Sequence, residues 1–455
     1  MARKPPKKQV AASVHKRKAE DIRKSLSIDA LVDLVREGVE KIPDDRPPED
    51  DISLPDALMS AFAMFSLKDP SLLAFDERRN DENLKTVYHI KNIPCDTHLR
   101  TILDSLDPEL LRPLFKDVFR QLQRGKALEP LVFHEGCYLL SLDGTGYFSS
   151  HKVHCPSCME KTSKNGEVTY YHQMLGAAIV HPDLKEVIPL MPEPIIKQDG
   201  ATKNDCERNA AKRFLDKLRH DHPHLGLIVI EDGLSSNGPH IRELQAHHLH
   251  YILGAKEGDH GFLFEQVRQA ECAGRVTGWE YLDEATGVQH RFRFLNEVPL
   301  NESNQDLLVN FLEYWEIHPT GRQQHFSWVT DFWLAEQNVY RIMQGGRSRW
   351  KIENETFNTL KNQGYQFEHN FGHGKQNLSV VFALLMMLAF LVDQTQQLCC
   401  PLFRNVWEKL GSKKMLWERM RSFFREHLVF SMQEVFEALY YGYGRSRPVL
   451  TDDST

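Results

Sequence analysis

Two short apolar segments of the chain each end in an aspartate that is followed by glycine, at Asp143 and at Asp232. Far downstream, a segment with helical spacing contains Arg349 and Glu353 and extends to Lys361. If the apolar segments are strands, the two aspartates stand at strand ends and the glutamate on a helix. Three carboxylates gathered in this way repel one another and take up protons unless divalent cations lie between them.

The chemistry that such a set of carboxylates could perform is phosphoryl transfer. Mg²⁺ prefers carboxylate and phosphate oxygens, and two ions about 4 Å apart can bind both the attacking and the leaving oxygen of an in-line displacement at phosphorus. We therefore expect Asp143, Asp232 and Glu353 to be the catalytic residues and to hold two Mg²⁺ ions, which Mn²⁺ can replace.

Each of these signals also has a simpler explanation. Asp-Gly is a common turn pair, and Arg349 and Glu353, four apart on one helix face, could form a surface ion pair worth about 0.3 to 0.5 kcal/mol. Their order on suitable elements favours the catalytic interpretation. The weaker carboxylate candidates are Asp199, Glu231, Asp331 and Glu355.

Length and charge constrain the partners of the chain. At 455 residues and roughly 150 residues per domain, two to four structural units are expected. The net charge of −7 argues against nucleic acid, but residues 1–30 contain nine lysine and arginine residues against three acids. This end is either a phosphate-seeking arm or a solvated tail.

Cysteine usage and hydropathy bear on the compartment. Eight cysteines in a long chain whose start, Met1 to Lys8, is polar and basic favour a reducing cytosol over a disulfide framework. The longest apolar run, from Leu378 to Val392, is shorter than the roughly 20 residues of a membrane span. We expect it to be a buried helix, with no role for a membrane.

The periodicity changes along the chain. A basic disordered arm (1–26) and a helical N-terminal domain that binds DNA (27–130) are expected before a core at 136–256 and 326–395. A β-rich insertion (257–325) interrupts this core, and a helical region and tail (396–455) follow it. The order strand, strand, strand, helix, strand, helix, strand predicts an α/β fold with a ribonuclease-H-like mixed sheet.

These residues resemble a known family, the DDE transposases of bacterial insertion sequences, in the subgroup with a β-strand insertion before the glutamate. The matching pieces are Leu142-Asp143-Gly144-Thr145, Ile230-Glu231-Asp232-Gly233 and Arg349-Trp350-Lys351-Ile352-Glu353-Asn354 with Lys361. The subgroup usually has a tyrosine three residues before the arginine and a lysine seven after the glutamate. Here the tyrosine position is Gly346, and Lys361 falls one place late.

The resemblance implies a bacterial, cytoplasmic, nucleoid-associated DNA transposase. Such an enzyme cuts the terminal inverted repeats of its own element and joins the ends to target DNA, working as a homodimer on double-stranded DNA. Arg349 would bind the DNA backbone bidentately, and Lys361 would add a point charge near a phosphate. The alternatives are a nuclease of the same fold without strand transfer and a catalytically silent DNA-binding protein derived from a transposase.

Two further segments carry residues that could bind ligands. His151, His154, Cys155 and Cys158 could hold a structural Zn²⁺, but both pairs crowd into eight residues and no distant second pair is evident. Reduced thiols in a loop are therefore the preferred interpretation of Cys155 and Cys158. The aromatic stretch from Tyr365 to His373 could stack on exposed bases or form a packed turn before the buried helix.

Overall fold

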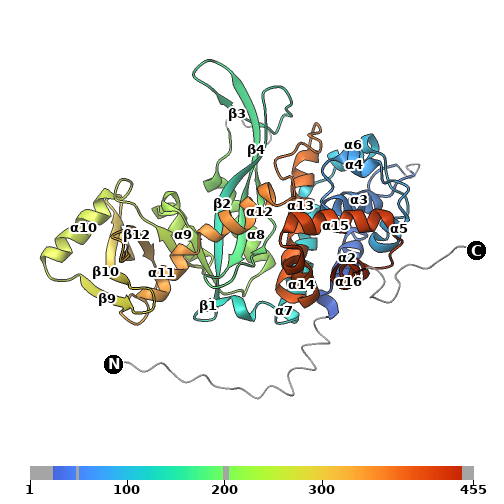
Figure 1. The fold of residues 1–455 in the computed structure, drawn as a ribbon. Coiled ribbons are helices and arrows are strands. Elements are labelled where there is room, and N and C mark those ends of the chain that lie inside the picture. The colour runs from blue at the N-terminus through green and yellow to red at the C-terminus, as the bar shows by residue number, and fades with distance from the viewer. Residues whose placement is uncertain (1–23, 48–50, 198–203, 443–455) are drawn as a thin grey trace, which may run out of the picture.

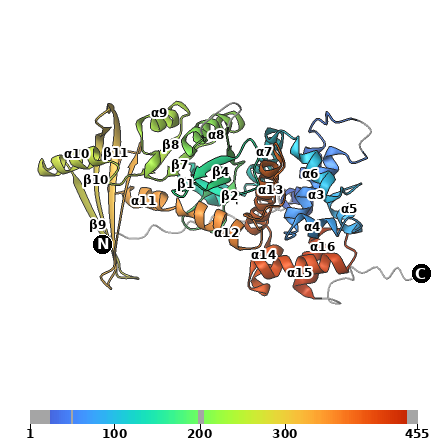
Figure 2. The ribbon, with the colours of Figure 1, turned by 90° about the horizontal axis from the view of Figure 1, so that it is seen from above.

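The computed structural model describes residues 24–47, 51–197 and 204–442. The molecule is elongated, with a helical body at one end, a β-rich extension at the other and the core of the sheet between them (Figures 1 and 2). The expected basic arm at residues 1–26 lies almost wholly outside the described residues, as does Asp199.

The centre of the molecule is a ribonuclease-H-like sheet, which confirms the predicted fold class. Its first strand, β2, pairs antiparallel with β4 and parallel with β7, and β7 pairs parallel with β8. Two short strands, β5 and β6, pair with β4. The bounds are β2 (Cys137–Ser150), β4 (Val168–Val180), β5 (Ile188–Pro189), β6 (Glu193–Ile195), β7 (Leu227–Glu231) and β8 (His250–Gly254).

Apolar content explains how these elements assemble. Every residue of β7 is buried, as expected of a parallel strand that is covered on both faces. The helix α8 (Glu207–Asp221) buries one stripe that includes Phe214 and Leu218, while its other positions are polar or charged. The helix α9 (Gly238–Ala246) connects β7 to β8. Because β2 and β7 are parallel neighbours, the residues that follow their paired segments lie at the same edge of the sheet.

The β-rich insertion extends the same sheet. After α10 (Gly261–Cys272), the strands β9 (Thr277–Asp283), β10 (Val288–Asn301) and β11 (Asn304–Ile317) form an antiparallel meander. The last strand, β12 (Gln323–Thr330), pairs antiparallel with both β11 and β8. With β1 (Val132–His134) and β3 (Met159–Thr162), the described residues form a 12-stranded sheet.

The helices from the two ends of the chain pack into one body. The apolar helix α13 (Leu378–Cys399) contacts α3, α6 and α7, and α16 contacts α2. The bounds are α2 (Ile28–Val39), α3 (Leu54–Ser66), α4 (Leu72–Asp76), α5 (Glu82–Tyr88), α6 (Asp96–Asp104), α7 (Arg112–Arg124), α14 (Pro401–Leu410), α15 (Lys413–Glu426) and α16 (Met432–Tyr441).

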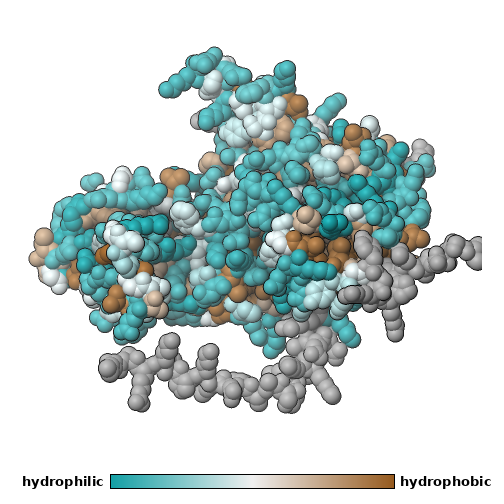
Figure 3. Space-filling model, in the orientation of Figure 1, coloured by the Kyte–Doolittle hydropathy of each residue, from teal (hydrophilic) through white to brown (hydrophobic). Residues whose placement is uncertain are grey.

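The helix α13 is longer than the apolar run suggested. Its length and hydropathy would suffice for a membrane span, but 94% of its apolar window is buried inside the protein. The face of the molecule in Figure 3 is mainly hydrophilic, with apolar residues in small groups. The helix is therefore the centre of the helical body, as predicted for a buried helix.

A helical stretch crosses one face of the sheet and joins the insertion to the helical body (Figure 1). It consists of α11 (Val339–Arg347), a π-helical segment called η5 (Ile352–Phe357) and α12 (Asn358–Asn362). The segment η5 contacts both β2 and β4. π-Helical turns are rare and occur often at functional sites, and this one carries Glu353.

Candidate functional site

Asp143 lies within strand β2, so the prediction that its strand ends there is wrong. The parallel pairing of β2 with β7 stops at Ser141 and Ile230, whereas the antiparallel pairing with β4 continues through Asp143 and Gly176. The apolar run ends at Asp143 because one neighbouring strand ends, although the strand itself goes on. The side chain of Asp143 therefore lies just beyond the point where β2 and β7 stop pairing.

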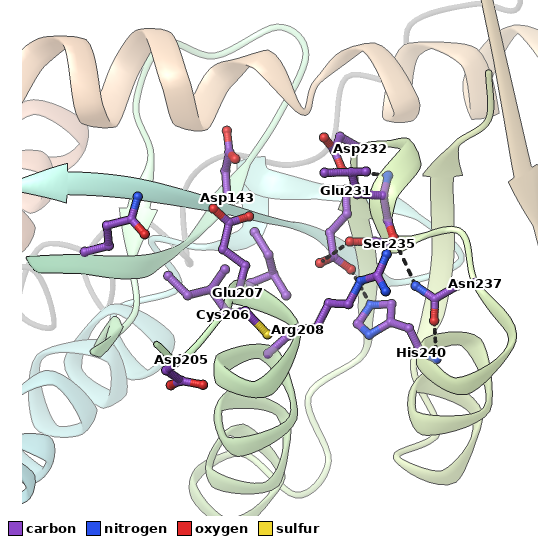
Figure 4. Close-up of a pocket in the computed structure, with 15 residues that line it drawn as sticks. Asp143, Asp205, Cys206, Glu207, Arg208, Glu231, Asp232, Ser235, Asn237 and His240 are labelled. Atoms are coloured by element: carbon purple, nitrogen blue, oxygen red, sulfur yellow. Dashed lines mark hydrogen bonds and ion pairs between the residues drawn. The ribbon is translucent and has the colours of Figure 1, made fainter. Parts of the chain in front are cut away.

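Asp232 directly follows β7, as predicted. Its Oδ1 accepts a hydrogen bond from the backbone N–H of Leu234 at 3.0 Å, which fixes the turn after the strand. Asp143 and Asp232 line the same cavity of about 500 Å³ (Figure 4). The two strands therefore bring both predicted aspartates to one side of the sheet.

Arg349 joins Glu353 to Asp143. Its Nη1 donates to Glu353 Oε1 at 2.7 Å and to Asp143 Oδ2 at 3.2 Å. The backbone carbonyl of Arg349 accepts a hydrogen bond from Ser141 Oγ at 3.1 Å, so the helical stretch is anchored to β2 beside Asp143. The ion pair between Arg349 and Glu353 that their spacing allows is present, but Arg349 also contacts the carboxylate of Asp143 on strand β2.

The surroundings of Asp143 disfavour the charged form of its carboxyl group. Burial and the neighbouring carboxyl of Glu353 raise the pKa of Asp143 to about 7, although the positive charge of Arg349 opposes the shift. A carboxyl group whose pKa is raised this far lacks enough positive charge or hydrogen bonds nearby to stabilise its ionised form. Cations other than Arg349 would stabilise this arrangement.

Glu207, the first residue of α8, is a further acidic residue that the sequence did not single out. It lines the cavity with Asp143 and Asp232, and Figure 4 shows its carboxylate on the other side of β2 from the carboxylate of Asp143. It fits there because residue 144 is glycine: a Cβ at Gly144 would overlap Glu207 Oε1. Burial raises the pKa of Glu207, and the charges of Asp232 and Glu231 add to this rise.

A second cavity of about 440 Å³ adjoins the first. Asp232, Lys256, Arg349 and Trp350 are among the residues that line it. The Trp350 side chain is 54% exposed, which is unusual for a tryptophan, and the guanidinium of Arg349 lies 5.9 Å from the centre of its ring. The cavity thus combines an aromatic face with positive charge next to the carboxylates.

The other carboxylate candidates have partners of their own. Glu231 accepts one hydrogen bond from Ser235 Oγ and binds His240 Nε2 at 2.6 Å. Asp331 accepts from the backbone of Tyr251 and binds His250. Glu355 lies near Lys413. Burial lowers the pKa of Lys413, and the negative charge of Glu355 is one of the charges that act against this lowering.

The two departures from the subgroup signature have different outcomes. Lys361 forms an ion pair with Glu368 at 2.9 Å, so the structure does not place it in the carboxylate cluster. At Gly346, a Cβ would overlap the indole of Trp328, so this helix packs too closely on β12 for a tyrosine.

The structure changes the interpretation of Cys155 and Cys158. Both thiols are buried and face His172 and His373, a distant pair of side chains able to bind a metal that the sequence analysis did not identify. In the stretch from Tyr365 to His373, both end residues are buried with Phe367 and Phe371, as expected of a packed turn, whereas His369 is exposed. The nearby His151 is exposed and binds the carbonyl of Val168 instead.

Comparison with known proteins identifies a family for the chain. A family model described as the transposase DDE domain matches residues 153–391, more than half of the chain. This range includes Asp232 and Glu353 and begins shortly after Asp143. No curated protein matches the chain. Among solved structures, a cryo-EM structure of a piggyBac transposase synaptic complex with hairpin DNA is similar, with 11% identity, coverage of 93% of this chain and 80% of that chain, and a TM-score of 0.38.

Proposed function

Because the chain belongs to the family of transposases with a DDE domain, we propose that it cleaves the ends of its own insertion sequence and joins them to target DNA. The proposal assigns the chemistry to Asp143, Asp232 and Glu353. The observation that supports it most strongly is the contact of one guanidinium, that of Arg349, with both Asp143 and Glu353, beside a cavity that Asp143 shares with Asp232.

The donor set fits hard divalent cations. Asp143, Asp232 and Glu353 offer only carboxylate oxygens, and such ligands suit Mg²⁺ and Mn²⁺. The raised pKa of Asp143 indicates charge that a cation would compensate. Two such ions, when bound, would polarise the phosphodiester and stabilise charge on the attacking and leaving oxygens.

The residues of the chain have distinct roles in this proposal. The aspartates fix one side of the site through strands β2 and β7, and Glu353 closes the other side from η5. Arg349 forms ion pairs with Asp143 and Glu353 in their present arrangement, and its fork of N–H groups could bind a phosphate once other cations compensate those carboxylates. End cleavage and strand transfer can share the site because each is an in-line attack on a phosphodiester.

DNA would reach the carboxylates across the second cavity. The exposed ring of Trp350 offers a stacking surface for an unpaired base, and Lys256 offers a positive charge beside it. Lys361 would have to exchange its ion pair with Glu368 for a phosphate. The helices α2 to α7 would recognise the terminal inverted repeats, and two copies would assemble on paired ends in the bacterial cytoplasm.

A plasmid assay tests this function. The protein is incubated with Mg²⁺ and a plasmid that carries the genomic sequences flanking its coding region. We expect excised element and joined products. Nicks without joined products would instead indicate a nuclease of this fold, and retarded but uncut DNA would indicate a silent binding protein derived from a transposase.

A further inference from the structure

A second cluster of metal-ligand side chains lies outside the carboxylate site. It contains Cys155 and Cys158 from the loop between β2 and β3, His172 from β4 and His373 from the segment between α12 and α13. All four side chains are buried, and none is more than 6% exposed. Buried thiols and imidazoles that face one another need partners, because their polar atoms have lost contact with water.

The ligand atoms stand at the separations of a tetrahedral site. The two Sγ atoms are 3.8 Å apart, and His172 Nε2 lies 3.4 Å from Cys155 Sγ and 3.2 Å from Cys158 Sγ. His373 Nε2 lies 3.2 Å from Cys158 Sγ, and all four ligand atoms are within 4.8 Å of one another.

These separations match those around one zinc ion. With bonds of about 2.3 Å to sulfur and 2.0 Å to nitrogen, tetrahedral geometry places two sulfurs about 3.8 Å apart and a sulfur and a nitrogen about 3.5 Å apart. We propose that Cys155, Cys158, His172 and His373 bind one structural Zn²⁺ ion. Four protein ligands leave no open position, so the site is closed and serves the fold.

The chemistry of the ligands selects the metal. A tetrahedral set of two sulfurs and two nitrogens suits zinc, whereas Mg²⁺ and Mn²⁺ favour oxygen ligands. Two thiolates and two neutral imidazoles around Zn²⁺ carry no net charge, so the complex can remain buried. This cluster and the carboxylate cluster therefore bind different metals in one chain.

Neighbouring residues hold the histidine rings and the thiols of the cluster in place. The hydroxyl of Tyr147 lies 3.2 Å from His172 Nδ1, which leaves Nε2 directed at the thiols. The ring of Phe148 stacks on His373 with centroids 4.1 Å apart. The backbone N–H of Cys155 donates to Cys158 Sγ at 3.4 Å, which favours the thiolate. Partners of this kind fix the ring orientation of metal-ligating histidines.

The zinc would join two parts of the catalytic core. Strand β2 carries Asp143 and leads into the cysteine loop, whereas His373 follows the helical stretch that carries Glu353. A metal bound by both fixes the end of this helical stretch against β2 and β4. The ion therefore has a positioning role in the proposed function, while its presence can be measured independently of that function.

Metal content tests the proposal directly. We expect one zinc per chain in the purified full-length protein by mass spectrometry of the metals. His373→Gln should lose this zinc, whereas His154→Gln, an exposed histidine beside Cys155, should keep it. His373→Cys should also retain zinc, because cysteine is an equally good ligand.

A second measurement on the unaltered chain avoids variants that fail to fold. Titration with an organomercurial should release one zinc per chain as Cys155 and Cys158 react, and Co²⁺ replacement should give the absorption bands of a tetrahedral site with thiolate ligands. The matched control, Cys272→Ser, should release the same amount of zinc, since Cys272 is exposed and lies outside the cluster. A protein with no zinc, or with a Cys155–Cys158 disulfide, would overturn the proposal.

Discussion

The carboxylate cluster and the cysteine–histidine cluster both collect metal-ligand side chains from distant segments, but they differ in access to solvent. The side chains of Asp143 and Glu353 are 25% and 41% exposed, beside a cavity large enough for a substrate group. The four residues of the other cluster are at most 6% exposed. An open site suits exchangeable ions that meet a substrate, and a closed one suits a permanent ion.

Substitution of Asp232 should reduce activity more than any other change considered below. Asp232→Asn should reduce Mg²⁺-dependent DNA cleavage by about 10²- to 10³-fold or more, because it removes a charged ligand. Asparagine can still accept the hydrogen bond from the backbone of Leu234, so stability and zinc content should stay unchanged. Asp306→Asn, at an exposed surface ion pair, is the control and should cleave normally. Normal cleavage by Asp232→Asn would remove this residue from the site.

Removing the metal from one cluster should affect activity, and removing it from the other should affect stability. Brief chelation with EDTA should stop cleavage while one zinc per chain remains bound, and added Mg²⁺ or Mn²⁺ should restore activity. Zinc release by an organomercurial should instead lower the melting temperature. Loss of both metals together under mild chelation, with recovery on zinc alone, would contradict the division between the clusters.

A moderate effect is expected from the orienting hydroxyl. Tyr147→Phe removes the partner of His172 Nδ1 and should weaken zinc binding by about 10- to 100-fold, as measured by competition with a chromogenic chelator. Cleavage at saturating zinc should remain close to that of the unaltered protein. Unchanged zinc affinity would show that the hydroxyl does not orient the ligand.

The smallest effect concerns pH and the charge of Asp143. Its pKa rises from the ordinary value of 3.8 to about 7, so between these values the folded state binds more protons than the unfolded state. Without divalent ions, this contribution should therefore make the protein less stable as pH rises from about 4 to 7. Melting curves should show Asp143→Asn gaining a few degrees over the unaltered protein toward pH 7. A gain that shrinks with rising pH would contradict the shift.

The parts of the fold that could be predicted from the sequence are those with a strong local pattern of apolar and charged residues. The unbroken apolar run of β7 and the aspartate after it identify a buried strand and its end. The spacing of Arg349 and Glu353 placed both on one helix face, where they form an ion pair. The strand order then sufficed for the ribonuclease-H-like sheet.

The parts that were missed depend on contacts between distant segments. Glu207 looks like any first residue of a helix until Gly144 admits it to the cavity. His373 is 215 residues from Cys158, so local spacing favoured the nearby His151 and His154 instead. The continuation of β2 beyond Asp143 depends on β4, which lies later in the chain.

The catalytic role of Glu353 is best tested with two glutamates that lie two positions apart on the same π-helical segment, Glu353 and Glu355. Glu353→Gln and Glu355→Gln are compared for Mg²⁺-dependent cleavage of labelled DNA from the flanking genomic ends, with DNA binding measured in parallel. We expect Glu353→Gln to bind DNA without cutting it and Glu355→Gln to bind and cut DNA. Cleavage by Glu353→Gln at the rate of the unaltered protein would contradict this role.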